Sequence, residues 1–156
     1  MSPGIENLED FVRDFADALA ALDASGKAHK NFKPGIGPWG EADGVRAALL
    51  LLQKRFPSRY SGAACKRTPD LLIPGKWAIE LKVIRPFGDN GKSAEHWSEN
   101  ILHPYSGNTS ALGDCLKLLA CGLPERKAVV YSDLSTTHLK SRLNRPSEVL
   151  SFWHHL

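Results

Sequence analysis

Three residues in the middle of the chain, Asp70, Glu80 and Lys82, have the types and the spacing that could perform chemistry. They lie within TPDLLIPGKWAIELK, residues 68–82. Successive side chains of a β-strand point to opposite faces of the sheet, so residues two positions apart share a face. Glu80 and Lys82 therefore project together from a strand, while the apolar residues that alternate with them face a core.

The turn at Pro74 and Gly75 decides whether Asp70 joins this pair. In an antiparallel hairpin, directly opposed residues point to the same side of the sheet. A two-residue loop would pair Asp70 with Ile79 and place the acid on the wrong face, whereas a three-residue loop or one bulge pairs it with Glu80. We predict the three-residue loop or the bulge.

An acid pair on a rigid sheet indicates a divalent cation. Two carboxylates held close together repel each other, and Mg²⁺, for which Mn²⁺ can substitute, is a hard cation that prefers oxygen ligands and keeps several of its waters. An ammonium group beside such a site can orient the attacking water or stabilise charge that develops on a phosphoryl oxygen. Asp70, Glu80 and Lys82 together suit phosphodiester hydrolysis.

The elements that position these residues follow from the spacing of apolar, turn-forming and capping residues. A helix of about a dozen residues between the last two predicted strands makes a parallel, right-handed crossover. The predicted elements are a helix over 5–22, a basic loop over 26–40, a helix from Trp39 or Gly40 to Phe56, strands over 58–65, 70–73 and 77–84, a short helical stretch over 93–102, a helix capped by Asn108 or Thr109 and stopped by Gly122, a strand over 126–133, and a weak helix over 147–156.

Composition indicates one domain without a membrane anchor. The 156 residues, 42% of them hydrophobic, suffice for one core and are too few for two ordinary domains. No apolar run approaches the roughly 18 residues of a membrane span, and no signal peptide is recognisable, so we expect a cytoplasmic protein. We divide the single domain into the N-terminal helix, the basic loop, a core of about 41–133 and a helical tail of 134–156.

Three cysteines without CxxC spacing argue against a disulfide framework. The net charge of +3 permits a polyanionic partner.

The helix, three strands, helix and strand, with the residues Pro69-Asp70 and Glu80-Leu81-Lys82, resemble the PD-(D/E)XK nuclease superfamily. The resemblance covers roughly residues 41–133. It implies an α/β fold of the three-layer restriction endonuclease-like type (αβββαβ), with a mixed central sheet and, here, an extra N-terminal helix. It also implies that Asp70 and Glu80 hold Mg²⁺, that the main-chain carbonyl of Leu81 is a further ligand, and that Lys82 assists the attacking water.

Further expectations come from the same resemblance. Many members carry a glutamate on the first core helix that reaches the metal directly or through water, and Glu41 matches that region. The substrate is expected to be DNA, cut by a restriction-type or repair-type endonuclease to leave a 5′-phosphate and a 3′-hydroxyl. A homodimer is suggested, because so small a domain cuts only one strand at a time. The segment LGDCLKLL, residues 112–119, lacks the glutamine and tyrosine found in some exonuclease members.

Four basic residues near the predicted site are candidates for contact with DNA. Lys66 and Arg67 precede Asp70, and Arg85 and Lys92 follow the strand that carries Lys82. Basic side chains position nucleic acid by binding phosphate oxygens. The alternative interpretation is that each belongs to an ordinary solvated surface.

Less specific interpretations stand beside the nuclease. A glutamate and a lysine on a solvated strand commonly form a surface pair worth under about 1 kcal/mol, and an acid such as Glu41 at a helix start can simply complement the helix dipole. The rival functions are a catalytically silent nucleic-acid-binding or assembly module with the nuclease fold, and a structural or toxin-like interaction protein whose acid pair is fortuitous. The absence of GxxxxGK[ST] and GxGxxG motifs argues against ATP or dinucleotide binding.

Overall fold

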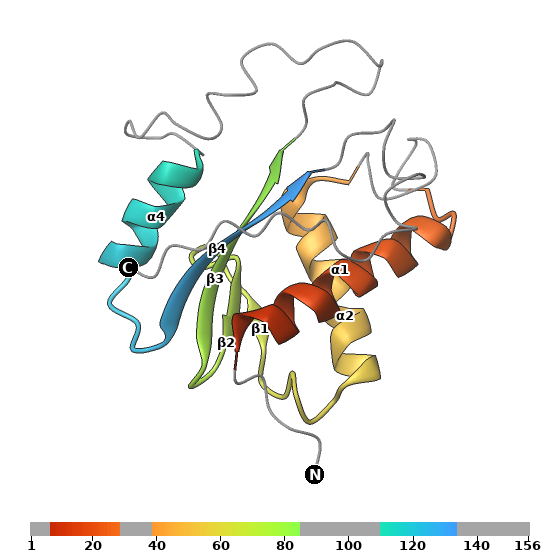
Figure 1. Cartoon of the computed structure of the whole chain (residues 1–156), viewed down its shortest axis with the longest axis horizontal. Coiled ribbons are helices and arrows are strands. Elements are labelled where there is room, and N and C mark those ends of the chain that lie inside the picture. The colour runs from red at the N-terminus through yellow and green to blue at the C-terminus, as the bar shows by residue number, and fades with distance from the viewer. Residues whose placement is uncertain (1–6, 29–38, 85–109, 134–156) are drawn as a thin grey trace.

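The helices and strands of the described residues follow one another in the order predicted for those parts of the sequence. The computed structural model describes residues 7–28, 39–84 and 110–133 (Figure 1). No helix in these ranges is long and apolar enough to cross a membrane. The elements are α1 (Leu8–Ala24), α2 (Glu41–Arg55), β1 (Ala64–Cys65), β2 (Leu71–Ile73), β3 (Trp77–Ile84), α4 (Ala111–Ala120) and β4 (Arg126–Asp133).

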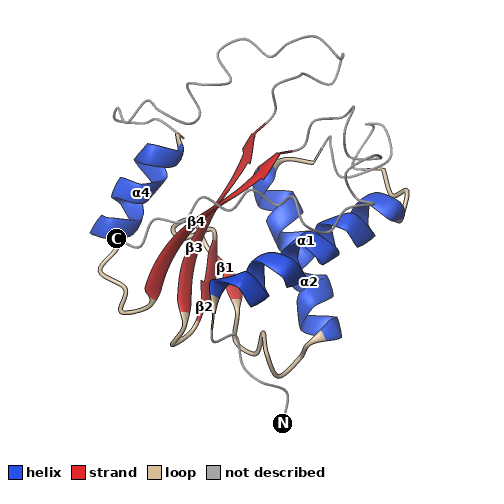
Figure 2. Cartoon of the chain, in the orientation of Figure 1, coloured by secondary structure: helices blue, strands red, loops and turns tan. Residues whose placement is uncertain are grey.

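The strands form one mixed sheet in the order β1-β2-β3-β4 (Figure 2). β1 and β2 pair antiparallel, as do β2 and β3, whereas β3 and β4 pair parallel along their whole length, from Trp77 opposite Arg126 to Ile84 opposite Asp133. Parallel neighbours need a crossover connection, and α4 lies in the chain between them. The α/β class, the mixed sheet and the parallel pairing are therefore confirmed.

The predicted strand over 58–65 is wrong for most of its length. Only Ala64–Cys65 is a strand. The preceding residues form turns, because the main-chain N–H groups of Arg59 and Tyr60 both donate to the carbonyl of Phe56, at 3.1 Å, and continue the winding of the chain after α2. Short-range hydrogen bonds therefore prevail over an extended conformation here.

The cap of α4 also differs from the prediction. The side chain of Ser110 caps this helix by accepting from the N–H of Gly113 at 3.0 Å, whereas Asn108 and Thr109 lie outside the described residues. The predicted helical stretches over 93–102 and 147–156 lie outside them too, as does residue range 29–38 of the basic loop.

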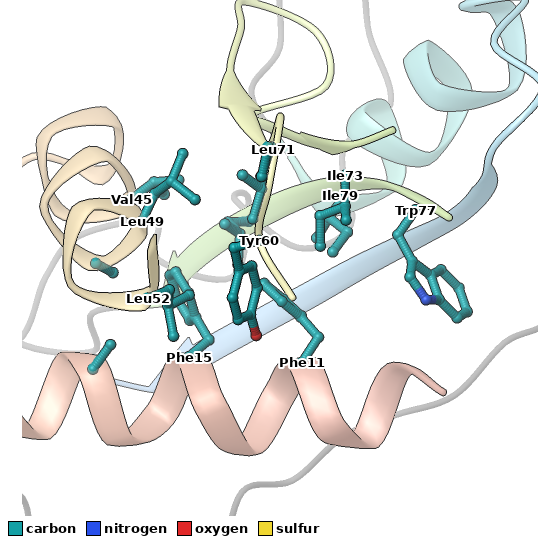
Figure 3. Packing of buried hydrophobic residues seen from close by; sticks show 14 of the residues in the cluster. Phe11, Phe15, Val45, Leu49, Leu52, Tyr60, Leu71, Ile73, Trp77 and Ile79 are labelled. Carbon is teal, nitrogen blue, oxygen red and sulfur yellow. The ribbon is translucent and has the colours of Figure 1, made fainter. Parts of the chain in front are cut away.

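A hydrophobic core fills the space between one face of the sheet and the helices α1 and α2 (Figure 3). Apolar side chains recur on one side of each helix and at alternate positions of β2 and β3, so each element presents one face to the others. Burial of this apolar surface is the main stabilising contribution to the fold. Its larger members are Phe11, Phe15, Val45, Leu49, Leu52, Tyr60, Leu71, Ile73, Trp77 and Ile79.

The opposite face of the sheet is covered by α4 and carries a much smaller apolar cluster. Leu118 of α4 packs with Leu72 of β2 and Ala78 of β3. Because side chains alternate along β3, Glu80 and Lys82 share this face with Ala78, while Ile79 and Leu81 belong to the large core. The sheet thus has an apolar face under α1 and α2 and a partly charged face under α4.

Candidate active site

A three-residue loop between β2 and β3 sets the register of the predicted site. The first pair of the hairpin is Ile73 opposite Trp77, and the N–H of Lys76 donates to the carbonyl of Ile73 at 3.0 Å. Gly75 takes a positive φ of 70°, a conformation that glycine adopts without steric penalty. The loop is therefore residues 74–76, and the prediction of three residues in place of two is confirmed.

This register places Asp70 opposite Glu80. The ladder runs to Leu71 opposite Ile79, and its next position pairs the two acids. Asp70 is anchored there because its Oδ2 accepts from the N–H of Leu81 at 2.9 Å. The carboxyl groups of Asp70 and Glu80 are close enough for Asp70 to raise the pKa of Glu80. The hairpin thus brings together two acids that lie ten positions apart in the sequence.

The carboxyl group of Glu80 is buried and incompletely satisfied. Glu80 is 4% exposed, and its Oε1 has no hydrogen-bond partner among the described residues. Burial, the hydrogen bond to Asp70 and the charges of Asp70 and Asp114 raise the pKa of Glu80 to about 9. At neutral pH, Glu80 therefore keeps a proton that it can donate to Asp70, and this proton is the positive charge that relieves the repulsion between the acids.

Lys82 is buried beside the acid pair and is held from two helices. Its Nζ lies 2.9 Å from Oδ2 of Asp114 on α4 and 3.7 Å from Oε1 of Glu41 at the start of α2. The side chain of Lys82 is only 7% exposed. A buried ammonium group is costly unless it is paired, and these two carboxylates supply the pairing.

Asp114 and Lys117 belong to the same cluster, although the sequence did not single them out. Oδ1 of Asp114 accepts from Nζ of Lys117 at 2.7 Å, so that one carboxylate binds two lysines. An acid and a lysine three residues apart are typical of a solvated helix face. The missed signal was that Asp114 shares the inward side of α4 with Ala111 and Leu118, both of which are buried.

Tyr131 is a second residue that the sequence analysis missed. It lies opposite Lys82 in the register of β3 and β4, on the face covered by α4. Burial, followed by the nearby Cys115 and Asp114, raises the pKa of its hydroxyl group. Tyr131 therefore borders the charged cluster from the neighbouring strand, and its position depends on a contact between distant parts of the sequence.

The described acids do not form a ready-made three-ligand metal site. Within 7–28, 39–84 and 110–133, no three His, Cys, Asp or Glu side chains are placed to hold one ion together. Glu41, the expected additional ligand, instead contacts Lys82. Asp70 and Glu80 nevertheless fit Mg²⁺, which binds through one or two carboxylates and keeps waters, and Oε1 of Glu80 is a buried oxygen still lacking a partner.

The charge balance of the cluster also suits a divalent cation. Among the residues that the structure describes, four carboxylates and two ammonium groups belong to the cluster, so its acids outnumber its cations. A bound Mg²⁺ or Mn²⁺ ion would add positive charge there, and in its absence the proton on Glu80 reduces the negative charge. The members of the cluster are Glu41, Asp70, Glu80, Lys82, Asp114 and Lys117.

The basic residues predicted to contact DNA and the predicted metal ligand Leu81 differ in how far the structure describes them. Lys66 and Arg67 are exposed, and the N–H of Lys66 donates to the carbonyl of Asp70 at 3.3 Å, so this basic pair starts beside the acid. Arg85 and Lys92 lie outside the described residues. The side chain of Leu81 is buried in the core, and the role of its carbonyl as a metal ligand stays a prediction.

In comparisons with protein-family models, curated proteins and solved structures, nothing matches this chain.

Proposed function

We propose that this chain is a metal-dependent nuclease that hydrolyses phosphodiester bonds of DNA, with a restriction endonuclease-like form of the α/β fold. The observation that carries the proposal is the opposed pair of Asp70 and Glu80, one of whose buried oxygens lacks a partner, with Lys82 on the same face. Holding two acids opposite each other, one of them buried, costs stability, so a ligand explains the arrangement better than folding does.

Each residue of the site has a separate role in the proposed hydrolysis. A bound Mg²⁺ ion would stabilise charge on the phosphoryl oxygen and make a water molecule a better nucleophile. Asp70 and Glu80 would hold it, and Glu80 must first release its proton to the solvent. Lys82, kept in place by its two ion pairs, would stabilise the negative charge that develops during in-line attack. Lys66 and Arg67, both exposed, would bind the DNA backbone.

The test is cleavage of supercoiled and linear DNA by the full chain in Mg²⁺, Mn²⁺ or EDTA. Cleavage is expected with either metal, absent with EDTA, lost in Glu80→Gln, and lowered to a small but measurable rate in Lys82→Met. Asp10→Asn is the matched control, because Asp10 forms a partly exposed pair with Arg13 on α1. The product ends are expected to be 5′-phosphate and 3′-hydroxyl. A wild-type protein that never cuts DNA in either metal would refute the proposal.

One observation favours the second candidate, a catalytically silent DNA-binding or assembly module. The ammonium group of Lys82 already has two carboxylate partners, as a purely structural lysine would. Gel-shift measurements in EDTA and in Mg²⁺ separate the two functions. DNA binding that is equal under both conditions, without cutting, would favour the silent module. Sedimentation of the free protein tests the homodimer that the resemblance suggests.

A further inference from the structure

We infer that Asp114 on α4 is a positioning residue that keeps Lys82 apart from the acid pair. This inference rests on the proposed nuclease function and extends it to a helix outside the recognised motif. Asp114 is nearly inaccessible, with a side chain 4% exposed, and each of its carboxylate oxygens binds a different lysine: Oδ2 binds Lys82 at 2.9 Å and Oδ1 binds Lys117 at 2.7 Å.

The location of Lys82 makes such a residue necessary. Lys82 projects from the same face of β3 as Glu80, two residues away, and Glu80 is opposed by Asp70. Among the described residues, Lys82 forms ion pairs with Asp114 and Glu41 and with neither member of the acid pair. Because a buried ammonium group requires an anionic partner, loss of Asp114 would draw Lys82 toward Asp70 and Glu80. The lysine would then compete with the cation for the carboxylates.

Lys117 accounts for the orientation of Asp114. The Lys117 side chain is 45% exposed, so it reaches Asp114 from the solvent side of α4 while Lys82 approaches from the sheet. With Oδ1 engaged by Lys117, Asp114 offers only Oδ2 to Lys82. The two contacts fix the carboxylate and define one position for the Lys82 ammonium group. Asp114 therefore acts through Lys82 and needs no contact with DNA or metal.

The experiment is a double-mutant cycle on Mg²⁺-dependent cleavage, with kcat and KM measured for each protein. Asp114→Asn is expected to lower kcat by about 10- to 100-fold, as is common for residues that orient a catalytic group, and to change the KM for DNA little. In a Lys82→Met background, the same substitution should cause no further loss, because its target is gone. In a Lys117→Met background the loss should persist.

Controls separate positioning from folding. Asp10→Asn makes the same acid-to-amide change in the partly exposed Asp10–Arg13 pair of α1 and should leave kcat unchanged. Asp114→Asn leaves a buried lysine with one partner fewer, so thermal unfolding is followed for every variant. If Asp114→Asn alone does not fold, Asp114→Asn/Lys82→Met removes both charges and should match Lys82→Met in kcat. Asp114→Glu keeps the charge and should be more active than Asp114→Asn.

The outcomes distinguish this inference from the proposed function. A wild-type protein without metal-dependent cleavage overturns the nuclease, and the inference with it. A wild-type protein that cuts DNA, together with an Asp114→Asn variant of equal kcat, overturns only the inference. The inference is also overturned if Asp114→Asn lowers kcat equally in the wild type and in the Lys82→Met background. Such additive effects are expected of a purely structural residue.

Discussion

Two groups of buried charges in this protein differ in how completely their charges are matched. In the first, Asp14 of α1 is 7% exposed, and its Oδ2 accepts from Arg59 at 2.7 Å and from the hydroxyl group of Tyr60 at 2.8 Å. One carboxylate thus meets one guanidinium group and one phenol. Burial, followed by the hydrogen bond to Asp14, raises the pKa of Tyr60, which keeps this hydroxyl group a donor.

The second group, under α4, has more acids than cations. Asp70 and Glu80 are opposed on one hairpin, Oε1 of Glu80 has no hydrogen-bond partner, and the lysine beside them, Lys82, is bound by other carboxylates. The contrast teaches that burial of charge does not by itself indicate a functional site. Matched charges join α1 to the rest of the fold, whereas unmatched acids leave room for a cation.

The largest expected difference between the two groups is in DNA cleavage. Asp70→Asn should reduce Mg²⁺-dependent cleavage by about 1,000-fold, because loss of a metal ligand removes several kcal/mol of transition-state stabilisation. Asp14→Asn, the same change in the matched group, should leave the rate per folded molecule unchanged. Initial rates are measured at equal concentrations of folded protein. Equal losses of cleavage rate in the two variants would show that the acid pair is no more important for activity than Asp14.

The next largest effect is on stability. Here the group around Asp14 should be sensitive to substitution and the group under α4 should not. Asp14→Ala should lower the free energy of unfolding by about 3 kcal/mol, because Arg59 and Tyr60 lose a buried acceptor. Glu80→Gln should cause no loss of stability in the metal-free protein, because it removes an acid whose charged form is destabilised by burial. Urea unfolding in EDTA measures both. A strongly destabilised Glu80→Gln would show that Glu80 is a structural residue.

The pH dependence of stability should show an effect that is smaller for each pH unit. In the metal-free folded protein, the pKa of Glu80 is raised from its ordinary value near 4.5 to about 9. Between these values the folded state holds a proton that the unfolded chain has lost, so stability is greatest at the acidic end and falls as pH rises. The slope is at most about 1.4 kcal/mol per pH unit.

Glu80→Gln is the control for this pH dependence. The difference in urea unfolding free energy between wild type and Glu80→Gln, measured from pH 5 to pH 9 in EDTA, isolates the contribution of one carboxyl group. Saturating Mg²⁺ should flatten the slope, because a metal-bound carboxylate no longer takes up the proton. A difference that does not vary with pH would contradict the raised pKa of Glu80.

The smallest effect concerns an exposed ion pair, which calibrates the other measurements. Arg46 and Asp43 on α2 lie 2.8 Å apart with side chains 61% and 37% exposed. Arg46→Ala should change the free energy of unfolding by only about 0.3 kcal/mol, because water screens exposed pairs. A loss as large as that of Asp14→Ala would show that exposure does not explain the contrast between buried groups.

The predicted elements show where reasoning from the sequence was accurate. The bounds of β3 and β4 agree with the predicted strands over 77–84 and 126–133, because apolar alternation in the first and the apolar centre of the second are strong signals. The predicted strand over 58–65 was mostly wrong, because hydrogen bonds to Phe56 turn the chain there. The spacing of apolar residues does not show whether a segment will form such turn hydrogen bonds or the hydrogen bonds of a strand.

The hairpin that brings Asp70, Glu80 and Lys82 to one face could be predicted from local sequence patterns. Alternation along a strand and the length of a turn are local properties, so neighbouring residues contain enough information to fix them. The surroundings of Lys82 could not be predicted in this way. Asp114 and Glu41 reach it from helices far away in the chain, and such contacts depend on how the helices pack against the sheet. Because that packing depends on the whole core, no segment of the sequence specifies it alone.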